Sequence, residues 1–266
     1  MANEFEGPMI RVVDLVTHYG ERRILNHVSL DIPAGETMVI LGGSGTGKST
    51  LLRHIMRLEL PSSGHIFIKD QDICYLQEER FNLLRRKIGM LFQSAALFNS
   101  MTIEENVALP LHELTQLEDS TIRIMTRIKL DLVGLSGFEN YMPSQLSGGM
   151  KKRAGLARAL AMDPEILLFD EPSAGLDPIT AAGIDSLILK LKVAFKMTIV
   201  VVTHELASAF VIADRITVMD QGRVIATGTP EEIRQSQHPR VLQFMNRIPE
   251  GDQMDAQTYL RTLTQN

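Results

Sequence analysis

The chain has 266 residues and a formal net charge of −5, which disfavours a nucleic-acid-binding surface. Its 44% hydrophobic residues suffice for one large domain or two small ones. The single cysteine, Cys74, excludes an internal disulfide and indicates a reducing compartment, and we expect it to be structural or incidental rather than reactive. Residues 1–6 lack the features of a signal peptide, and no apolar run approaches the roughly 18 residues that cross a bilayer. We therefore expect a protein that is soluble by itself.

The first part of the chain is predicted to form strands. Residues 10–16, 28–32 and 37–41 are apolar or alternate between apolar and polar. Residues 17–20 read as a turn between the first two strands, with Tyr19 as an isolated aromatic. By residue type alone, packing in the core or turn explains Tyr19 better than stacking on a base does.

Residues 42–49, Gly-Gly-Ser-Gly-Thr-Gly-Lys-Ser, fit the phosphate-loop pattern G-x-x-x-x-G-K-[ST] without a mismatch. A predicted strand precedes them, and apolar residues at helical spacing follow: Leu51, Leu52, Ile55 and Leu58. Such a loop points backbone N–H groups at an anion, and the helix N-terminus adds a positive dipole end. Lys48 is expected to reach the β- and γ-phosphates, and the Ser49 hydroxyl to hold Mg²⁺. The sequence thus predicts a nucleotide site.

A helical segment is expected to interrupt the strands. Residues 65–68 and 87–92 read as strands, with helical composition at 78–86 between them. Gln93 follows the second of these strands, where a glutamine is ordinarily a solvated loop residue. From about residue 94 to 146 the strand patterns stop and apolar residues recur at helical spacing, which predicts a helical insertion.

The insertion ends in a second candidate phosphate-binding element. Residues 146–150, Leu-Ser-Gly-Gly-Met, stand directly before a predicted helix, where N–H groups and the helix dipole favour an anion. A second such element is redundant within one chain, so it is expected to serve the nucleotide of another subunit. The basic residues 151–153 are better explained as a solvated helix face than as a nucleic-acid patch.

Two carboxylates end the next predicted strand. Residues 165–169 are mostly apolar, as in a buried parallel strand, and Asp170 and Glu171 follow at its ligand-facing end. Asp170 suits Mg²⁺, which prefers oxygen ligands, and Glu171 can orient or deprotonate the attacking water, help that contributes roughly 10²–10⁴-fold. The alternative is that this pair merely caps a strand.

Further polar residues mark the ends of later elements. Asp177 is a predicted N-cap with Pro178 at the first helical position. His204 follows a predicted strand at 197–202, in a position that is either ligand-facing or structural. Residues 215–226 read as a hairpin, and a helix starting at residue 230 leads into a polar tail.

This ordered set of motifs resembles the nucleotide-binding subunit of ATP-binding cassette (ABC) transporters, over residues 9–230. The resemblance implies an α/β P-loop NTPase fold. Its RecA-like ATP-binding core, with an antiparallel β subdomain, would comprise residues 1–93 and 160–230. An inserted α-helical subdomain would span 94–159, and a C-terminal helix and tail 231–266.

The resemblance also implies a head-to-tail homodimer that binds ATP and Mg²⁺ between its subunits. Tyr19 would stack on adenine, Glu171 would be the catalytic base, His204 would contact the γ-phosphate, and Asp177 would signal across the dimer. Gln93 would couple Mg²⁺ and the attacking water to a membrane partner, and Ser49, Gln93 and Asp170 would hold the metal. The implied nucleotide-contacting residues are Tyr19, Gly42, Gly43, Ser44, Gly45, Thr46, Gly47, Lys48, Ser49, Thr50, Ser147, Gly148, Gly149 and Asp177.

One residue departs from the common pattern, because Met150 stands where most cassette ATPases carry Gln. The signature Leu-Ser-Gly-Gly-Met and the segments 92–98 and 239–244 are similar to those of the ATPases of MCE-type lipid transporters, especially the bacterial Mla phospholipid group. That likeness implies work at the cytoplasmic face of the bacterial inner membrane, with phospholipid as substrate. The implied partners are an integral-membrane permease, an MCE lipid-binding protein and a STAS-domain subunit, with no nucleic acid.

Three alternatives remain open. An amino-acid or metal importer would use the same motifs. A soluble cassette ATPase acting on ribosomes or DNA usually carries two cassettes or a long coiled-coil insertion, and this chain shows neither. A non-hydrolysing regulatory subunit would be expected to lack the lysine or the base, whereas Lys48 and Glu171 are both present.

Overall fold

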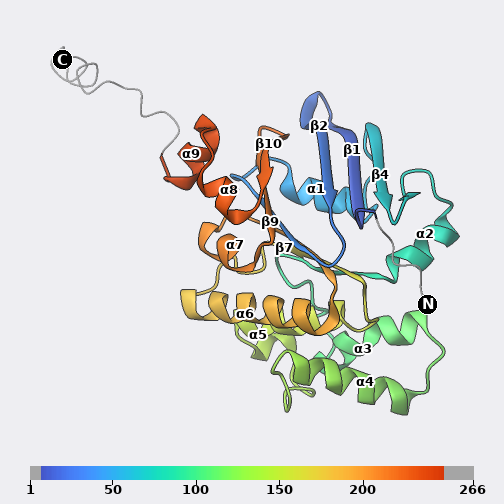
Figure 1. The fold of residues 1–266 in the computed structure, drawn as a ribbon. Coiled ribbons are helices and arrows are strands. Elements are labelled where there is room, and N and C mark those ends of the chain that lie inside the picture. Colours follow the sequence, from blue (N-terminus) through green and yellow to red (C-terminus); the bar gives the residue numbers. More distant parts are fainter. Residues whose placement is uncertain (1–6, 249–266) are drawn as a thin grey trace, which may run out of the picture.

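The protein is built on a six-stranded central sheet with the strand order β10-β9-β3-β8-β7-β6. The computed structural model describes residues 7–248, and Figure 1 shows the fold. Neighbouring strands are parallel, except that β10 is antiparallel to β9. The strands are β3 (Thr37–Leu41), β6 (Ile88–Leu91), β7 (Ile166–Asp170), β8 (Thr198–Thr203), β9 (Arg215–Asp220) and β10 (Arg223–Gly228). The predicted hairpin after residue 215 is therefore confirmed.

Both faces of this sheet are buried, which explains its uninterrupted apolar strands. Along β3, Val39 and Leu41 belong to one hydrophobic core, whereas Met38 and Ile40 point into another. The first core packs against helices α5 (Gly148–Ala159) and α6 (Pro178–Phe195), and the second lies between the two sheets.

The second sheet is antiparallel, with the strand order β2-β1-β4-β5. Its strands are β1 (Ile10–Tyr19), β2 (Arg22–Ile32), β4 (Ser63–Ile68) and β5 (Gln71–Asp72). Helix α1 (Lys48–Ile55) packs within the core between the sheets. Two expectations were wrong: β1 runs to Tyr19, because Tyr19 pairs with Arg22 in β2, and Leu58 lies beyond α1 with 52% of its surface exposed.

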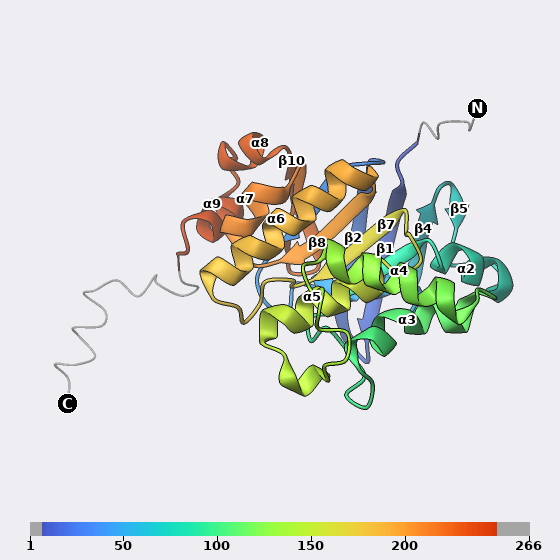
Figure 2. The same cartoon turned by 90° about the horizontal axis from the view of Figure 1, so that it is seen from below.

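The chain between β6 and β7 is helical, as expected for the insertion. It forms α3 (Ile103–Leu114), α4 (Asp119–Leu132), a 3₁₀ turn (Pro143–Gln145) and α5, and Figure 2 shows α3, α4 and α5 gathered on one side of the molecule. Thr102 and Glu105 form a capping box that starts α3. Helix α5 contacts α3 and α4 and also β6 and α6, so it bridges the helical layer and the central sheet.

The remaining helices are α2 (Glu78–Arg85), α7 (Leu206–Ile212), α8 (Pro230–Arg234) and α9 (Pro239–Met245). Helix α8 confirms the predicted helix start at residue 230, and the end of the polar tail lies outside the described residues. Within residues 7–248, no helix has both the length and the apolar character needed to cross a bilayer. Cys74 packs against the core between the sheets, and burial raises the pKa of its thiol.

Candidate nucleotide-binding site

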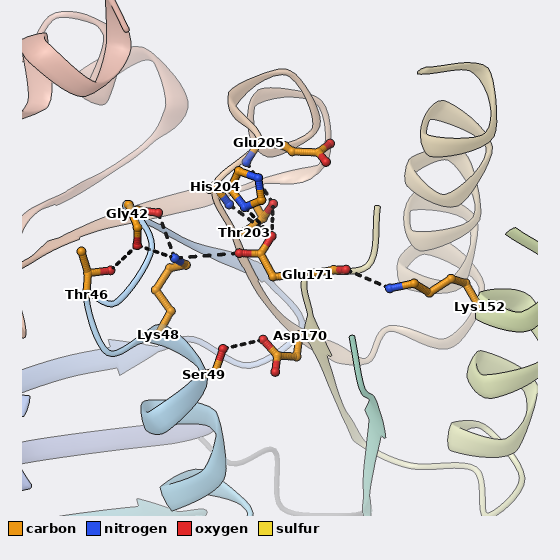
Figure 3. Close-up of polar contacts among 11 residues, drawn as sticks. Gly42, Thr46, Lys48, Ser49, Lys152, Asp170, Glu171, Thr203, His204 and Glu205 are labelled. Carbon is orange, nitrogen blue, oxygen red and sulfur yellow. Dashed lines mark hydrogen bonds and ion pairs between the residues drawn. The ribbon is translucent and has the colours of Figure 1, made fainter. Parts of the chain in front are cut away.

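The phosphate loop joins β3 to α1 at the carboxyl edge of the central sheet. Gly47 adopts a φ of 96°, and a Cβ there would lie 2.6 Å from Leu25 Cδ2, so this position requires glycine. Lys48 begins α1 and is buried, and its ammonium donates to the carbonyls of Gly42 and Gly43 at 2.9 Å each (Figure 3). The loop thus presents its lysine and the start of α1 at one point.

Ser49 and Asp170 are brought together from distant parts of the sequence. The Ser49 hydroxyl donates to Asp170 Oδ1 at 2.8 Å. Since β3 and β7 run parallel on either side of β8, their carboxyl ends meet at the same edge. No cluster of three or more His, Cys, Asp or Glu side chains suited to a metal occurs among residues 7–248. The oxygen pair nevertheless fits Mg²⁺, which commonly takes one or two protein ligands and completes its shell with phosphates and water.

Glu171 is buried and lies beside two candidate partners for the phosphate chemistry. Its Oε2 is 2.9 Å from His204 Nδ1, and its Oε1 is 3.8 Å from Lys48 Nζ (Figure 3). Thr203 Oγ1 also donates to Oε2 at 3.3 Å. Burial lowers the pKa of Lys48, whereas the charges of Glu171 and Asp170 oppose that shift. The predicted carboxylate, lysine and histidine therefore share one small site.

Tyr19 and Gln93 lie at the margin of this group. Tyr19 ends β1 with 44% of its surface exposed, so the alternative of core packing is wrong, and its hydroxyl donates to Glu59. Gln93 is exposed and follows β6, the strand that pairs with β7. Among the described residues Gln93 makes no hydrogen bond to Ser49 or Asp170, so their joint metal role stays a prediction.

The second candidate phosphate-binding element forms a separate group with Asp177. Ser147 caps α5 by accepting from the N–H of Met150 at 3.3 Å, and Asp177 caps α6, as predicted, by accepting from the N–H of Thr180 at 3.0 Å. Hydrogen bonds from Thr180 hold the pKa of Asp177 below its usual value. Gly149 brings the two helix starts together, because a Cβ there would lie 2.4 Å from Thr180 Cγ2.

The prediction of a solvated face for residues 151–153 was wrong for Lys152. Its side chain is 5% exposed, and its ammonium donates to the backbone carbonyl of Glu171 at 3.0 Å. Arg153 is half-buried and donates to the carbonyl of Val133. The missed signal is spacing, because Lys152 precedes the buried Leu156 by four residues and so shares its helix face.

The fold and this site define a P-loop protein that binds nucleotide at the carboxyl edge of a mostly parallel sheet. Residues 25–174 match the family described as ABC transporter. A protein of Haemophilus influenzae called intermembrane phospholipid transport system ATP-binding protein MlaF is 42% identical over 96% of this chain and 98% of its own length. The chain therefore belongs to the ABC transporter family, as an ATP-binding and ATP-hydrolysing member.

Other relatives extend this comparison. MlaF of Escherichia coli K12 is 40% identical over 87% of this chain and 86% of its own. A probable ribonucleotide transport ATP-binding protein, mkl, of Mycobacterium leprae is 42% identical over 90% of this chain and 69% of its own. The dimeric, post-hydrolysis ATP-binding cassette MJ0796 bound to ADP and Pi has a TM-score of 0.77 and 34% identity, covering 84% of this chain and 99% of that one. The structure of cbiO1 of Clostridium perfringens has a TM-score of 0.79 and 31% sequence identity, and the match covers 91% of this chain and 100% of that one.

Proposed function

We propose that this chain is the ATP-hydrolysing subunit of a transporter that moves phospholipid between the inner and outer membranes. The observation that carries the proposal is its similarity to the Haemophilus influenzae MlaF protein, which extends over 96% of this chain and 98% of that one. Ribonucleotide transport is the second candidate, because the Mycobacterium leprae relative has the same identity of 42%, although the alignment leaves about a third of that protein unmatched.

The proposed reaction is attack of water on the γ-phosphorus of ATP, which breaks the bond to the β–γ bridging oxygen and leaves ADP and phosphate. Such a transfer depends mainly on positioning and charge neutralisation. Lys48 would exchange its two loop carbonyls for β- and γ-phosphate oxygens, and Glu171 would take a proton from the water. His204, 2.9 Å from Glu171 Oε2, would contact the γ-phosphate. Ser49, Gln93 and Asp170 would hold Mg²⁺, which would supply positive charge against the phosphate oxygens.

The base role of Glu171 has a direct test. Glu171→Gln keeps the size and hydrogen-bonding capacity of the side chain but removes the proton acceptor, so we expect ATP affinity to be retained while turnover falls at least tenfold. Turnover is measured by phosphate release and affinity by calorimetry. A variant that hydrolyses ATP at the parent rate would remove Glu171 from the base role.

Assembly is part of the same proposal. Two copies would pair head to tail, with Ser147, Gly148 and Gly149 of one copy facing the nucleotide of the other. Asp177 would signal between the two subunits of this dimer. The dimeric form of the MJ0796 cassette supports this arrangement. The pair would work at the cytoplasmic face of the inner membrane with a permease, an MCE lipid-binding protein and a STAS-domain subunit. Its subdomains would be those defined above, with 94–159 as the helical insertion.

Co-purification from the native host tests the transport assignment. The chain is tagged, membranes are solubilised in mild detergent, and co-purifying proteins and lipids are identified by mass spectrometry, with a strain expressing the tag alone as control. We expect a permease, an MCE-domain protein and bound phospholipid. A complex without lipid-binding proteins whose bound cargo is ribonucleotide would favour the second candidate. Recovery of ribosomal or DNA-repair proteins instead would refute transport.

A further inference from the structure

Lys152 is a buried cation that the proposed reaction leaves without a role. It lies one turn into α5, the helix whose first residues are the Ser147-Gly148-Gly149 element, and only 5% of its surface is exposed. Burying an ammonium is costly unless it is paired and hydrogen-bonded. Burial lowers the pKa of Lys152, and three carboxylates, Asp170, Glu171 and Glu205, oppose that shift. A buried lysine whose ammonium donates to the backbone of the predicted base therefore needs an explanation.

The contact that Lys152 makes is with the backbone of Glu171. Its ammonium donates to the Glu171 carbonyl (Figure 3), and this hydrogen bond is 3.0 Å long. The N–H of Ala174 donates to the same oxygen at 3.2 Å. Glu171 has a φ of 49°, a left-handed conformation that is unusual for a residue other than glycine. Such a conformation costs on the order of 1–3 kcal/mol and persists only where the surroundings enforce it.

The enforced conformation sets the direction of the Glu171 side chain. On the other side of the residue, its N–H donates to the carbonyl of Val202 in β8 at 2.9 Å. The backbone is therefore held from both sides, by β8 and by α5, with the carboxylate 2.9 Å from His204 Nδ1 and 3.8 Å from Lys48 Nζ. Among residues 7–248, the Glu171 carbonyl accepts from Lys152 and from the N–H of Ala174, so removing the Lys152 ammonium would leave it only the turn to Ala174.

Helix α5 makes a second contact of the same kind further along. Arg158 donates to the carbonyls of Ala95 at 3.0 Å and Ala96 at 2.8 Å, two residues of the loop that follows Gln93. Both alanines are left-handed, with φ of 62° and 48°. Helix α5 thus contacts left-handed backbone at two places. Lys152 holds it at Glu171, and Arg158 holds it in the loop after Gln93.

We propose that Lys152 is a positioning residue, which fixes the Glu171 backbone so that the carboxylate faces the attacking water. Lys152 also links this carboxylate to α5, the helix that would present Ser147 to the nucleotide of a second copy. The inference rests on the proposed function, because it takes Glu171 as the base. Engagement of α5 by the nucleotide of the other copy would then be transmitted to this subunit's own catalytic carboxylate through Lys152.

The test compares full-length Lys152→Met, Lys152→Arg and Glu171→Gln, and the Glu171→Gln/Lys152→Met double variant, with Lys151→Met as matched control on the neighbouring lysine. We expect Lys152→Met to lower kcat about tenfold while KM for ATP changes less than twofold, and Lys152→Arg to recover most of the rate because it keeps a charged donor. In the Glu171→Gln background, Lys152→Met is expected to change the residual rate less than twofold, because a residue acting through Glu171 has no effect once the base is gone.

Thermal melting is recorded for every variant, and Lys152→Leu, which also lacks a hydrogen-bond donor, replaces Lys152→Met if that variant does not fold. A folded Lys152→Met or Lys152→Leu variant with the parent kcat would overturn the inference, and so would losses that multiply in the double variant. Parent-like turnover of Glu171→Gln would instead refute the base role on which the inference rests. The two failures are therefore distinguishable.

Discussion

At the scale of single residues, Tyr19 is held in place by the segment that follows the phosphate-loop helix. Its hydroxyl donates to the Glu59 carboxylate, while His54 Nδ1 lies 2.9 Å from the Glu59 carbonyl and His54 Nε2 lies 2.7 Å from Thr17 Oγ1. Burial lowers the pKa of His54, and a neutral imidazole that donates through Nδ1 accepts from Thr17 at Nε2. These contacts fix the ring of Tyr19 relative to α1.

We expect Tyr19→Ala to weaken ATP binding about tenfold, because stacking on a base contributes roughly 1–3 kcal/mol and 1.4 kcal/mol corresponds to tenfold. Binding of tripolyphosphate, which has no base, should be unchanged. Calorimetry with ATP and with tripolyphosphate separates the contribution of the base from that of the phosphates. Tyr19→Phe, which retains the ring, is the control. An equal loss of affinity for tripolyphosphate would show that Tyr19 supports the phosphate loop rather than adenine.

At the scale of secondary-structure elements, the starts of α5 and α6 are packed against each other through Gly149. A Cβ at Gly149 would lie 2.4 Å from Thr180 Cγ2, and Thr180 cannot rotate away without losing the 2.5 Å hydrogen bond from its hydroxyl to Asp177 Oδ2. At Gly148 a Cβ would meet Leu176 at an ordinary 3.5 Å. Of these two glycines, Gly149 is therefore the one that the contact between the helix starts requires.

We expect Gly149→Ala to lower the free energy of unfolding by about 1–3 kcal/mol, the usual cost of overpacking. Adding Thr180→Ser, which removes the clashing methyl group and keeps the hydroxyl for Asp177, should restore stability. Urea unfolding measures both variants, and Gly148→Ala is the control expected to keep the parent stability. If Gly149→Ala remains as stable as the parent, the helix starts are free to separate and the packing role is wrong.

At the scale of the whole molecule, the exposed start of α6 is a candidate surface for pairing. Ile179 stands two residues after Asp177 with 86% of its surface exposed, and Val193 is 79% exposed near the other end of the same helix. A large apolar side chain beside the Ser147 and Asp177 elements is suited to burial against a second copy.

We expect Ile179→Asp to weaken ATP-dependent dimerisation at least tenfold, because a charge at the centre of an apolar contact must be desolvated. The measurement is light scattering with ATP in the slow Glu171→Gln background. Val193→Asp makes the same chemical change outside the proposed interface and should dimerise like the parent. Equal dimerisation of both variants would exclude the start of α6 from the interface.

The two sheets are also joined by an ionic link through Glu165, just before β7. Glu165 contacts Lys69, between β4 and β5, and lies 2.9 Å from Lys87, just before β6. Burial alone would raise the pKa of Glu165, but the hydrogen bonds and charges of the two lysines outweigh it and hold the pKa below 4.5. The stabilisation is therefore complete above pH 4.5 and is lost as the pH falls through the lowered folded value.

We expect Glu165→Gln to lower the free energy of unfolding by a constant amount from pH 7 to about 5.5, and the difference from the parent to narrow below pH 4.5. Urea unfolding across this range measures the difference, with Glu21→Gln in the exposed β1–β2 turn as control. A difference that stays constant down to the acid transition would mean that the ionised carboxylate is not the source of the stabilisation.

The sequence by itself determined the phosphate loop, the carboxylates at the end of β7, the N-cap at Asp177 and the helix that begins after Ser147. These features are readable because each is local: phosphate binding requires a strand, a glycine-rich loop and a helix in direct succession, and a cap requires a polar residue just before the helix. The buried strands were predictable for a similar reason, since a strand covered on both faces is apolar throughout.

Only the tertiary structure decided which of these distant features lie together and which side chains between them are buried. The order of the six strands places Ser49 beside Asp170, and the contact of α5 with the sheet buries Lys152, whose sequence neighbours suggested a solvated face. Likewise β1 extends through Tyr19 because β2 pairs with it. Burial and long-range pairing depend on which faces the topology brings together, and residue type or spacing along one segment contains little of that information.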